Sequence, residues 1–371
     1  MARSTKRQIG YAVVGLGHIA QSAMLPAFAN ANENSRLVAL VSDSREKRRE
    51  LQKKYGVPHT YSYAEYEDCL RNEEVDAVYI ALPNSMHADF TVRAAKAGVH
   101  VLCEKPMALT ERECRQMIAA CDDAGVKLMI AYRLHLEPAH LEAVELARSG
   151  RLGELRFFSS DFSMRVRPGN IRVQRELGGG PLGDIGIYCI NASRYLFRSE
   201  PLEVSAFAAR GRDPRFREVD EAVSVIMRFP DERLATFTCS FGASSVGSLR
   251  LVGTKGDYRM ENAYDYAGER TRWLTTSQGT EPRTFPPSDQ FGPQLTYFSR
   301  CILSNRDPEP SGKEGLADLR VMKAIYKSVD LRRAVRVEAV PRKRRPEAAQ
   351  LIRKQKVSEP RLVNVEPPHA G

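Results

Sequence analysis

Short apolar runs alternate with amphipathic stretches along the chain as far as residue 131. The apolar runs cover residues 11–15, 37–41, 77–82, 99–103 and 127–131. Helical patterns between them cover residues 45–55, 63–71, 87–97 and 110–124. The runs are continuous and rich in Val, Ile and Leu, which is typical of strands buried on both faces of a parallel sheet. The alternation predicts an α/β Rossmann domain, with a doubly wound parallel sheet, over residues 8–132.

Beyond residue 153 the pattern changes to strands that are separated by turns. Strand patterns cover residues 155–164, 203–209, 222–229, 235–241, 248–252 and 257–260, and helical patterns follow at 294–304 and 313–333. They predict an α+β C-terminal domain over residues 133–337, built on a large, open and mostly antiparallel sheet. Helices that cover one face of such a sheet leave the other face apolar. We therefore expect a homodimer or homotetramer that associates through this sheet.

The positive charge is concentrated at the end of the chain. The formal net charge of the 371 residues is +10, and residues 341–371 carry +5 of it together with five prolines. Such a composition predicts a basic, disordered tail, with a weak contact to polyanions or to a membrane surface as its alternative role. The folded part has no basic and aromatic recognition motif, so nucleic acid is not an expected partner.

The remaining composition excludes further classes of protein. No apolar stretch approaches the roughly 18 residues that cross a bilayer. The first apolar run leads into a glycine turn rather than a signal-peptide cleavage site, so we expect a cytoplasmic protein. The seven cysteines include no Cys-x-x-Cys pair, which predicts packed thiols and no metal site.

The first apolar run ends in a glycine-rich turn that opens a helical pattern. Residues 15–20 read Gly-Leu-Gly-His-Ile-Ala. In this setting the first glycine permits a tight turn, and the second lets the backbone approach a pyrophosphate. The helix N-terminus offers unpaired N–H groups to the phosphates. The turn predicts a dinucleotide site formed by Gly15, Leu16, Gly17, His18 and Ile19.

The second apolar run ends where a Rossmann domain recognises the adenosine ribose. The candidate residues there are Ser42, Asp43, Arg45 and Lys47. An acidic side chain accepts hydrogen bonds from the ribose of NAD, whereas cations and hydroxyls accommodate the 2′-phosphate of NADP. Because such phosphate partners surround Asp43, we expect NADP in preference to NAD. The alternative for Asp43 or Ser44 is that it only caps the following helix.

Polar residues also follow two later strands of the predicted parallel sheet. Ligands of an open α/β sheet lie beyond the carboxyl ends of its strands, so these residues are expected to face the cofactor. The two clusters contain the candidate cofactor residues Leu82, Pro83, Asn84, His87, Glu104 and Lys105, and Arg133 is a further candidate.

Five short motifs follow one another along the chain. They are residues 15–20, Pro83-Asn84-x-x-His87, Glu104-Lys105-Pro106, Tyr132-Arg133-x-His135 and residues 178–188. Together they resemble the glucose–fructose oxidoreductase / inositol dehydrogenase / rhizopine catabolism family, over residues 8–337. The likeness to the glucose–fructose oxidoreductase branch is closest, through residues 184–196. It implies an NAD(P)-dependent oxidoreductase of a sugar or cyclic polyol, most concretely one that oxidises a pyranose at C1 to a lactone.

The resemblance also implies the catalytic positions, which are Lys105, Asp184 and Tyr188. Asp184 and Tyr188 are four residues apart and would project from one helix face. A phenol is protonated near neutrality, and the ammonium of Lys105 would favour its ionised form. Tyr188 would then take the proton from a sugar hydroxyl while Asp184 orients the sugar. The expected substrate residues are Lys105, Arg133, His135, Arg172, Asp184 and Tyr188, with Asn191 as a further candidate.

Two alternatives remain at this point. Tyr188 and Asp184 have structural interpretations, as a core tyrosine and a helix cap, and residues 178–180 could form only a flexible turn. The alternative function is that of a catalytically silent sugar or redox sensor, which the presence of all three catalytic positions disfavours.

The first predicted strand begins at Ile9, which leaves no long N-terminal arm of the kind that retains the cofactor in the related branch. We therefore expect the cofactor to exchange at each turnover.

Overall fold

The computed structural model describes residues 7–342 and 344–369, and these residues form two compact units. Unit 1 holds the described residues of Met1–Arg133, Ser288–Gly315 and Ile352–Pro367. Unit 2 holds the described residues of Leu134–Pro287, Leu316–Leu351 and Pro368–Gly371. Each unit therefore combines segments that are far apart in the sequence, whereas the sequence patterns predict contiguous domains.

Unit 1 is built on a parallel sheet with the strand order β3-β2-β1-β4-β5-β6. The strands are β1 (Ile9–Val14), β2 (Ser35–Val41), β3 (His59–Tyr61), β4 (Ala77–Ile80), β5 (His100–Cys103) and β6 (Leu128–Ile130). All neighbouring strands run parallel. The strand order reverses between β1 and β4, where Rossmann folds bind their ligands. The predicted doubly wound fold is confirmed.

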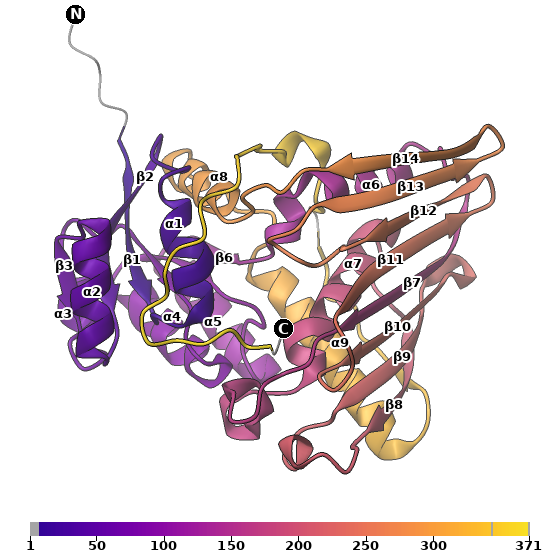
Figure 1. The fold of residues 1–371 in the computed structure, drawn as a ribbon, viewed down its shortest axis with the longest axis horizontal. Helices are drawn as coiled ribbons and strands as arrows, with labels where there is room; N and C mark the ends of the chain where they lie inside the picture. The colour runs from indigo at the N-terminus through magenta and orange to yellow at the C-terminus, as the bar shows by residue number, and fades with distance from the viewer. Residues whose placement is uncertain (1–6, 343, 370–371) are drawn as a thin grey trace, which may run out of the picture. The chain divides into compact units, whose positions relative to one another are not determined.

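Helices cover both faces of this sheet (Figure 1). They are η1 (Ala20–Met24), α1 (Leu25–Ala27), α2 (Arg45–Tyr55), α3 (Tyr66–Leu70), α4 (His87–Lys96), α5 (Glu111–Asp123) and α8 (Gly292–Leu303). Local signals set their ends: Thr110 and Glu113 form a capping box at the start of α5. The late helix α8 joins this unit because Ser299 lies 2.8 Å from the buried hydroxyl of Tyr11 on β1.

Unit 2 is built on an open sheet with the strand order β14-β13-β12-β11-β7-β10-β9-β8-β15. Its strands are β7 (Leu155–Ser163), β8 (Glu203–Ala209), β9 (Ala222–Arg228), β10 (Leu234–Ser240), β11 (Val246–Gly253), β12 (Gly256–Glu261), β13 (Arg270–Thr276), β14 (Gly279–Phe285) and β15 (Val335–Arg336). β7 and β10 pair in parallel, and the other neighbours are antiparallel. The prediction of a large, mostly antiparallel sheet is confirmed.

One face of this sheet is covered and the other is open. The α-helices of unit 2 are α6 (Pro138–Arg148), α7 (Ile187–Phe197) and most of α9 (Gly312–Leu331). Only the first four residues of α9, as far as Gly315, belong to unit 1. Along β9, buried and exposed residues alternate strictly. The open face carries large apolar side chains, and Phe207 is 79% and Ile226 54% exposed. Such a patch is typical of a surface that another protein chain covers.

The described residues of the tail (341–342 and 344–369) follow a defined path, in contrast to the predicted disorder. Arg345 pairs with Glu200 in unit 2 at 2.7 Å, and Lys354 pairs with Glu33 in unit 1 at 3.1 Å. The composition predicts disorder because the tail has too few apolar residues for a core of its own. Its order comes instead from ion pairs and hydrogen bonds to surfaces that the two units provide.

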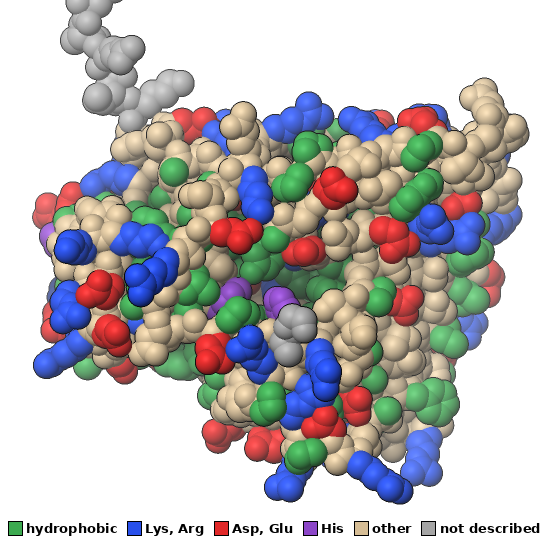
Figure 2. All heavy atoms as spheres, viewed as in Figure 1, with side chains coloured by type: hydrophobic (Ala, Val, Ile, Leu, Met, Phe, Trp, Pro, Cys, Tyr) green, Lys and Arg blue, Asp and Glu red, His purple; other side chains and the backbone are tan. Residues whose placement is uncertain are grey.

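Charged side chains of both signs are interspersed on the face of the molecule in Figure 2. Every cysteine is buried, and none forms a disulfide within the described residues. In the same part of the chain, no helix has both the length and the apolar character that a membrane crossing requires.

The buried carboxylate of Glu200 generates a stability prediction. Burial raises its pKa, but Arg194 and Arg345 outweigh this and lower the pKa to about 2. We expect Glu200→Gln to lower the free energy of unfolding by about 3 kcal/mol at pH 7, because two guanidinium groups lose their partner. A folded-state pKa below the unfolded value means that this stabilisation is present above about pH 4.5 and is lost as the pH falls toward 2.

Urea unfolding of the parent and the variant at pH 7, 5 and 3 measures this effect. The control is Glu269→Gln, which changes an exposed carboxylate and should alter stability little at any pH. A difference between the parent and Glu200→Gln that stays constant from pH 7 to pH 3 would refute the assignment.

Candidate active site

The glycine turn after β1 has one position that excludes any side chain and one that leaves open space. Gly15 has a φ of +93°, and a Cβ on it would lie 2.6 Å from the carbonyl oxygen of Ala81. Beyond the adjoining stretch of its own chain, no atom lies within 4 Å of the place where a Cβ on Gly17 would be. Gly17, His18 and Ile19 are partly exposed, whereas Leu16 is buried. The backbone of residues 17–19 is therefore accessible to a ligand, as a pyrophosphate site requires.

The residues after β2 differ in their contacts: one of them caps the following helix, and the proposed ribose residues do not. Ser44 caps α2, since its side chain accepts a hydrogen bond from the N–H of Lys47 at 3.3 Å. The capping interpretation is therefore correct for Ser44. Asp43 is exposed, and its carboxylate accepts a hydrogen bond from the N–H of Tyr63 at 2.8 Å instead. Ser42 is buried, and Arg45 is exposed.

The loops after β4 and β5 are tied together by a buried histidine. The ring nitrogens of His87 lie 2.9 Å from the carbonyl oxygens of Leu82 and Pro106, and the side chain has no exposed area. Burial lowers the pKa of this imidazole. The sequence places His87 at the cofactor surface. In the structure its side chain is fully buried and joins the loops after β4 and β5 to each other.

Glu104 and Lys105 follow β5 on one of these loops. The Tyr79 hydroxyl donates to Glu104 Oε1 at 2.6 Å, and the Lys105 N–H donates to Oε2 at 3.2 Å. Burial raises the pKa of Glu104, and the positive charge of Lys105 opposes this effect. Lys105 is partly exposed, as are Pro83 and Asn84 on the neighbouring loop. The guanidinium of Arg133 is buried and donates to Gln290 within unit 1.

In unit 2, Asp184 and Tyr188 stand out by their exposure. Asp184 lies on the π-helical turn η6 (Leu182–Gly186), and Tyr188 lies on the first turn of α7, which continues it. Of residues 181–197, these two alone are not buried. The predicted common face therefore exists, and Tyr188 is not a core tyrosine. π-Helical turns occur frequently at functional sites.

Arg172 joins the glycine-rich loop to Asp184. Its side-chain Nε donates to Asp184 Oδ2 at 2.6 Å. Its carbonyl oxygen accepts a hydrogen bond from the N–H of Gly180 at 2.9 Å. A Cβ on Gly179 would lie 2.4 Å from that same oxygen, so the glycine is required by close packing. The interpretation of residues 178–180 as only a flexible turn is wrong.

Tyr188 rests on an aromatic cluster. Its ring lies 5.8 Å from that of Phe162 and 6.0 Å from that of Tyr264, and the latter two rings stack at 5.0 Å. Such contacts restrict the ring without using the hydroxyl group. Neither Phe162 nor Tyr264 could be recognised from the sequence as part of the site, because an aromatic residue in or beside a strand is an ordinary core residue.

A buried polar network lies behind these side chains, and it contains two predicted site residues. His135 Nε2 lies 2.7 Å from Asn191 Oδ1, and Asn191 Nδ2 donates to Asp318 at 2.8 Å. Asp318 also pairs with Arg194. A carboxylate can only accept hydrogen bonds, so the NH₂ group of Asn191 must face Asp318 and its amide oxygen must face His135. Because an amide oxygen also only accepts, Nε2 of His135 carries the proton of that hydrogen bond. Both predicted residues are at most 3% exposed, so their side chains lie within the buried network rather than at the surface.

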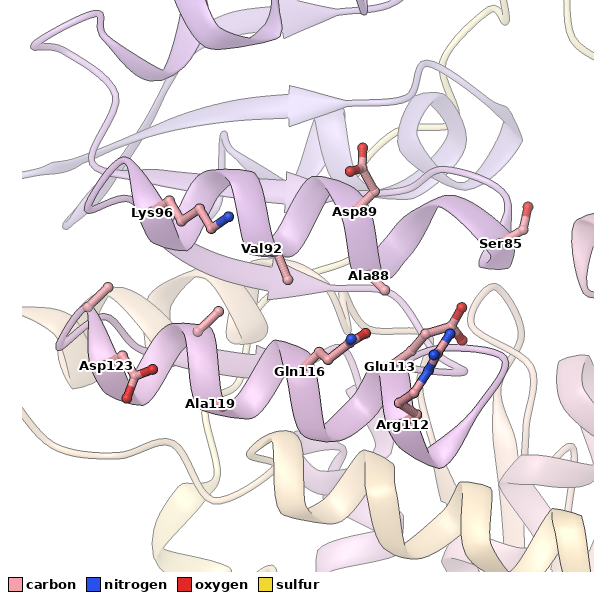
Figure 3. A pocket seen from close by; sticks show the side chains of 12 residues that line it. Ser85, Ala88, Asp89, Val92, Lys96, Arg112, Glu113, Gln116, Ala119 and Asp123 are labelled. Atoms are coloured by element: carbon pink, nitrogen blue, oxygen red, sulfur yellow. The ribbon is translucent and has the colours of Figure 1, made fainter.

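A hollow of about 810 Å³ lies between α4 and α5 of unit 1 (Figure 3). Val92 on α4 and Ala119 and Gln116 on α5 point into it. The described residues that line it include none of the predicted site residues. We therefore do not assign it to the candidate active site.

The geometry in unit 1 is that of a dinucleotide-binding Rossmann fold, and comparison with known proteins extends this to a family. Residues 9–132 match the oxidoreductase family with an NAD-binding Rossmann fold, and residues 140–259 match the GFO/IDH/MocA C-terminal domain. The chain belongs to the GFO/IDH/MocA family of oxidoreductases. The predicted family and the predicted class of enzyme are confirmed.

Several characterised proteins are similar over most of this chain. An aldose–aldose oxidoreductase from Caulobacter crescentus is 41% identical, with a TM-score of 0.86 over 89% of this chain and 100% of the relative. A D-xylose 1-dehydrogenase [NADP(+)] from Haloarcula marismortui is 31% identical over 90% of this chain and 95% of its own length. A 3-ketoreductase from Actinomadura kijaniata, solved with NADP, is 25% identical, with a TM-score of 0.79 over 87% of this chain and 98% of the relative.

The two glycines of the turn after β1 yield a paired prediction. We expect Gly17→Ala to fold normally, because there is space for the methyl group, and to bind NADPH at least tenfold more weakly, because the backbone can no longer approach the pyrophosphate. Gly15→Ala should lower the melting temperature, because of both its clash and its positive φ. Thermal unfolding and fluorescence titration with NADPH measure the two effects. Unchanged NADPH affinity in Gly17→Ala would contradict the assignment.

Proposed function

We propose that the chain is an NADP(H)-dependent dehydrogenase that oxidises a sugar hydroxyl, most concretely the C1 hydroxyl of a pyranose, to give a lactone. The observation that carries this proposal is the selective exposure of Asp184 and Tyr188 on an otherwise buried helical segment. An acid–base pair must meet its substrate, whereas core residues need not. Relatives with NADP and aldoses in their names support the choice of cofactor and substrate class.

The proposed roles follow from the chemistry of each side chain. Tyr188 takes the proton of the sugar hydroxyl, and Lys105 holds that oxygen and favours the phenolate. Asp184 orients the sugar, and Arg172 fixes the carboxylate of Asp184 at 2.6 Å. Bound NADP would supply the nicotinamide that accepts the hydride. The residues expected to hold the dinucleotide are Gly15, Leu16, Gly17, His18, Ile19, Ser42, Asp43, Arg45, Lys47, Leu82, Pro83, Asn84, Glu104 and Arg133.

A substrate panel tests this proposal. Aldoses, aldonates and inositols are incubated with the protein and either NADP or NAD, and absorbance reports the reduced nucleotide. We expect aldoses with NADP to give the highest rates. Dinucleotide binding without turnover of any sugar would favour the sensor alternative instead. The cytoplasmic location stays a prediction.

A second candidate function is favoured by the 41% identity to an aldose–aldose oxidoreductase. In that case one aldose reduces the nucleotide, and a second aldose takes the hydride back without release of the nucleotide. A second arm of the same panel tests it with dialysed protein, two aldoses and no added nucleotide. Conversion in this arm distinguishes the transfer reaction from an ordinary dehydrogenase.

Tyr188 provides the decisive variant. We expect Tyr188→Phe to lower kcat by roughly a hundredfold or more, the scale of a lost acid–base group. The affinity for NADPH should stay nearly unchanged, because the proposed role of the phenol is on the sugar. Tyr55→Phe is the control, since Tyr55 lies at the end of α2 and has no proposed role. A parental kcat in Tyr188→Phe would exclude it as the base.

We further propose that the chain forms a homodimer or homotetramer through the open face of the unit 2 sheet. Replacing Phe207 and Ile226 with Glu should yield monomers in light scattering, because both exposed apolar side chains lie on that face. The control is Leu303→Glu, which changes an apolar side chain of similar exposure (44%) on α8. Equal masses for the parent and the double variant would contradict this interface.

A further inference from the structure

A late segment of the chain is hydrogen-bonded to the helix that the glycine turn opens. Gln21 lies on η1 and is only 1% exposed. Its Oε1 accepts a hydrogen bond from the N–H of Val363 at 2.7 Å, and its Nε2 donates to the Val363 carbonyl oxygen at 3.0 Å. The same Nε2 donates to the carbonyl oxygen of Leu16, within the turn itself, at 2.9 Å. One buried side chain thus joins the glycine turn to the tail.

The same segment also contacts α2, the helix that follows the ribose corner. Asn364 Nδ2 donates to Glu46 Oε2 at 3.2 Å, in the first turn of α2. At the other end of that helix, Lys54 Nζ donates to the carbonyl oxygen of Arg361 at 3.0 Å. Residues 361–364 therefore contact both ends of α2 as well as η1. Figure 1 shows the end of the chain as a yellow trace that passes beside α1.

Earlier tail residues fasten the segment independently of these contacts. Asn30 Nδ2 donates to the carbonyl oxygen of Gln355 at 2.8 Å, and Gln355 forms a β-bridge with Ser288. The last described residues are held within unit 2, where His369 forms a β-bridge with Val166. The segment between them is thus anchored before and after its contacts with η1 and α2.

These contacts coincide with the adenosine half of a dinucleotide site. In a Rossmann fold the pyrophosphate lies at the turn after the first strand, and the ribose lies at the end of the second. Those positions are residues 16–19 and 42–43 in this chain. Gln21 follows the first of them directly and Glu46 follows the second. A segment bonded to both side chains would therefore lie beside a nucleotide bound at these positions.

We propose that residues 361–366 form a strap that covers the adenosine half of the bound nucleotide and slows its release. This inference rests on the proposed function, since it requires NADP(H) at this site. The strap buries little surface, since its apolar side chains at 362, 363 and 365 are only half-buried and residues 361, 364 and 366 are exposed. Segments with so few buried contacts open locally without global unfolding. Opening of the strap would then precede release of the nucleotide.

A backbone substitution isolates the hydrogen bond at the centre of the strap. Val363→Pro removes the N–H that Gln21 accepts, whereas Val363→Ala retains it and shortens the same side chain. NADPH dissociation is measured by stopped-flow fluorescence after mixing with excess NADP. We expect Val363→Pro to release NADPH roughly tenfold faster, the scale of one or two lost hydrogen bonds, and Val363→Ala to remain within about twofold of the parent. Deletion of residues 361–371, which keeps the Gln355 anchor, should accelerate release at least as much.

The outcomes separate the strap from the function on which it rests. Parental dissociation rates in both Val363→Pro and the deletion variant, with parental melting temperatures, would overturn the strap. Slower release in these variants would overturn it as well, since the segment would then compete with the nucleotide. If the parent protein binds neither NADPH nor NADH, the proposed function fails together with the strap. Faster release with parental melting temperatures supports the strap.

Discussion

Arg194 is fully buried, and a guanidinium that is removed from water must be paired. Its partners are two carboxylates of unit 2, Asp318 on α9 and Glu200 after α7, and Glu200 also pairs with Arg345. Loss of either carboxylate would leave positive charge buried without compensation. This requirement fixes α7 against α9, and it also fixes the Asn191 amide, which bonds to Asp318. Because α7 cannot rotate, Asp184 and Tyr188 remain on the accessible side of their helical segment.

The candidate site lies where the chain departs from regular helices. π-Helical turns occur at η1, directly after the dinucleotide turn, and at η6, which carries Asp184. Close backbone contacts accompany both, at Gly15 against Ala81 and at Gly179 against Arg172. Each departure costs stability relative to a regular helix, and it persists because surrounding packing determines it. Both departures lie beside accessible groups, the backbone of residues 17–19 and the side chain of Asp184.

The parts of the fold that depend on burial could be predicted from the sequence, and the parts that depend on partners could not. β1 is buried along its whole length and forms an unmistakable apolar run. β14 has one buried residue at its end, so its pattern contains no alternation, and it forms only because β13 supplies a ladder of backbone hydrogen bonds. His87 illustrates the same limit at the site. Its place in a motif predicted a ligand contact, but its burial between two carbonyl groups is determined by loops that the pattern does not describe.

The tail is the clearest case of an interaction that composition cannot reveal. Its charge and proline content predict disorder because they predict little apolar burial, and the segment from 361 to 366 indeed buries little. Its contacts with Gln21 are made by backbone groups, which every residue except proline carries. Apart from Asn364, whose side chain donates to Glu46, the contacts of the segment leave no mark in its composition. The clearer sign is Gln21, a buried amide on an apolar helix, which needs hydrogen-bond partners. Hydrogen bonds of this kind contribute little to folding, about 1 kcal/mol each, yet a contribution of that size changes a dissociation rate severalfold. A weakly held segment can thus have little influence on the fold and a large one on how long a nucleotide stays bound.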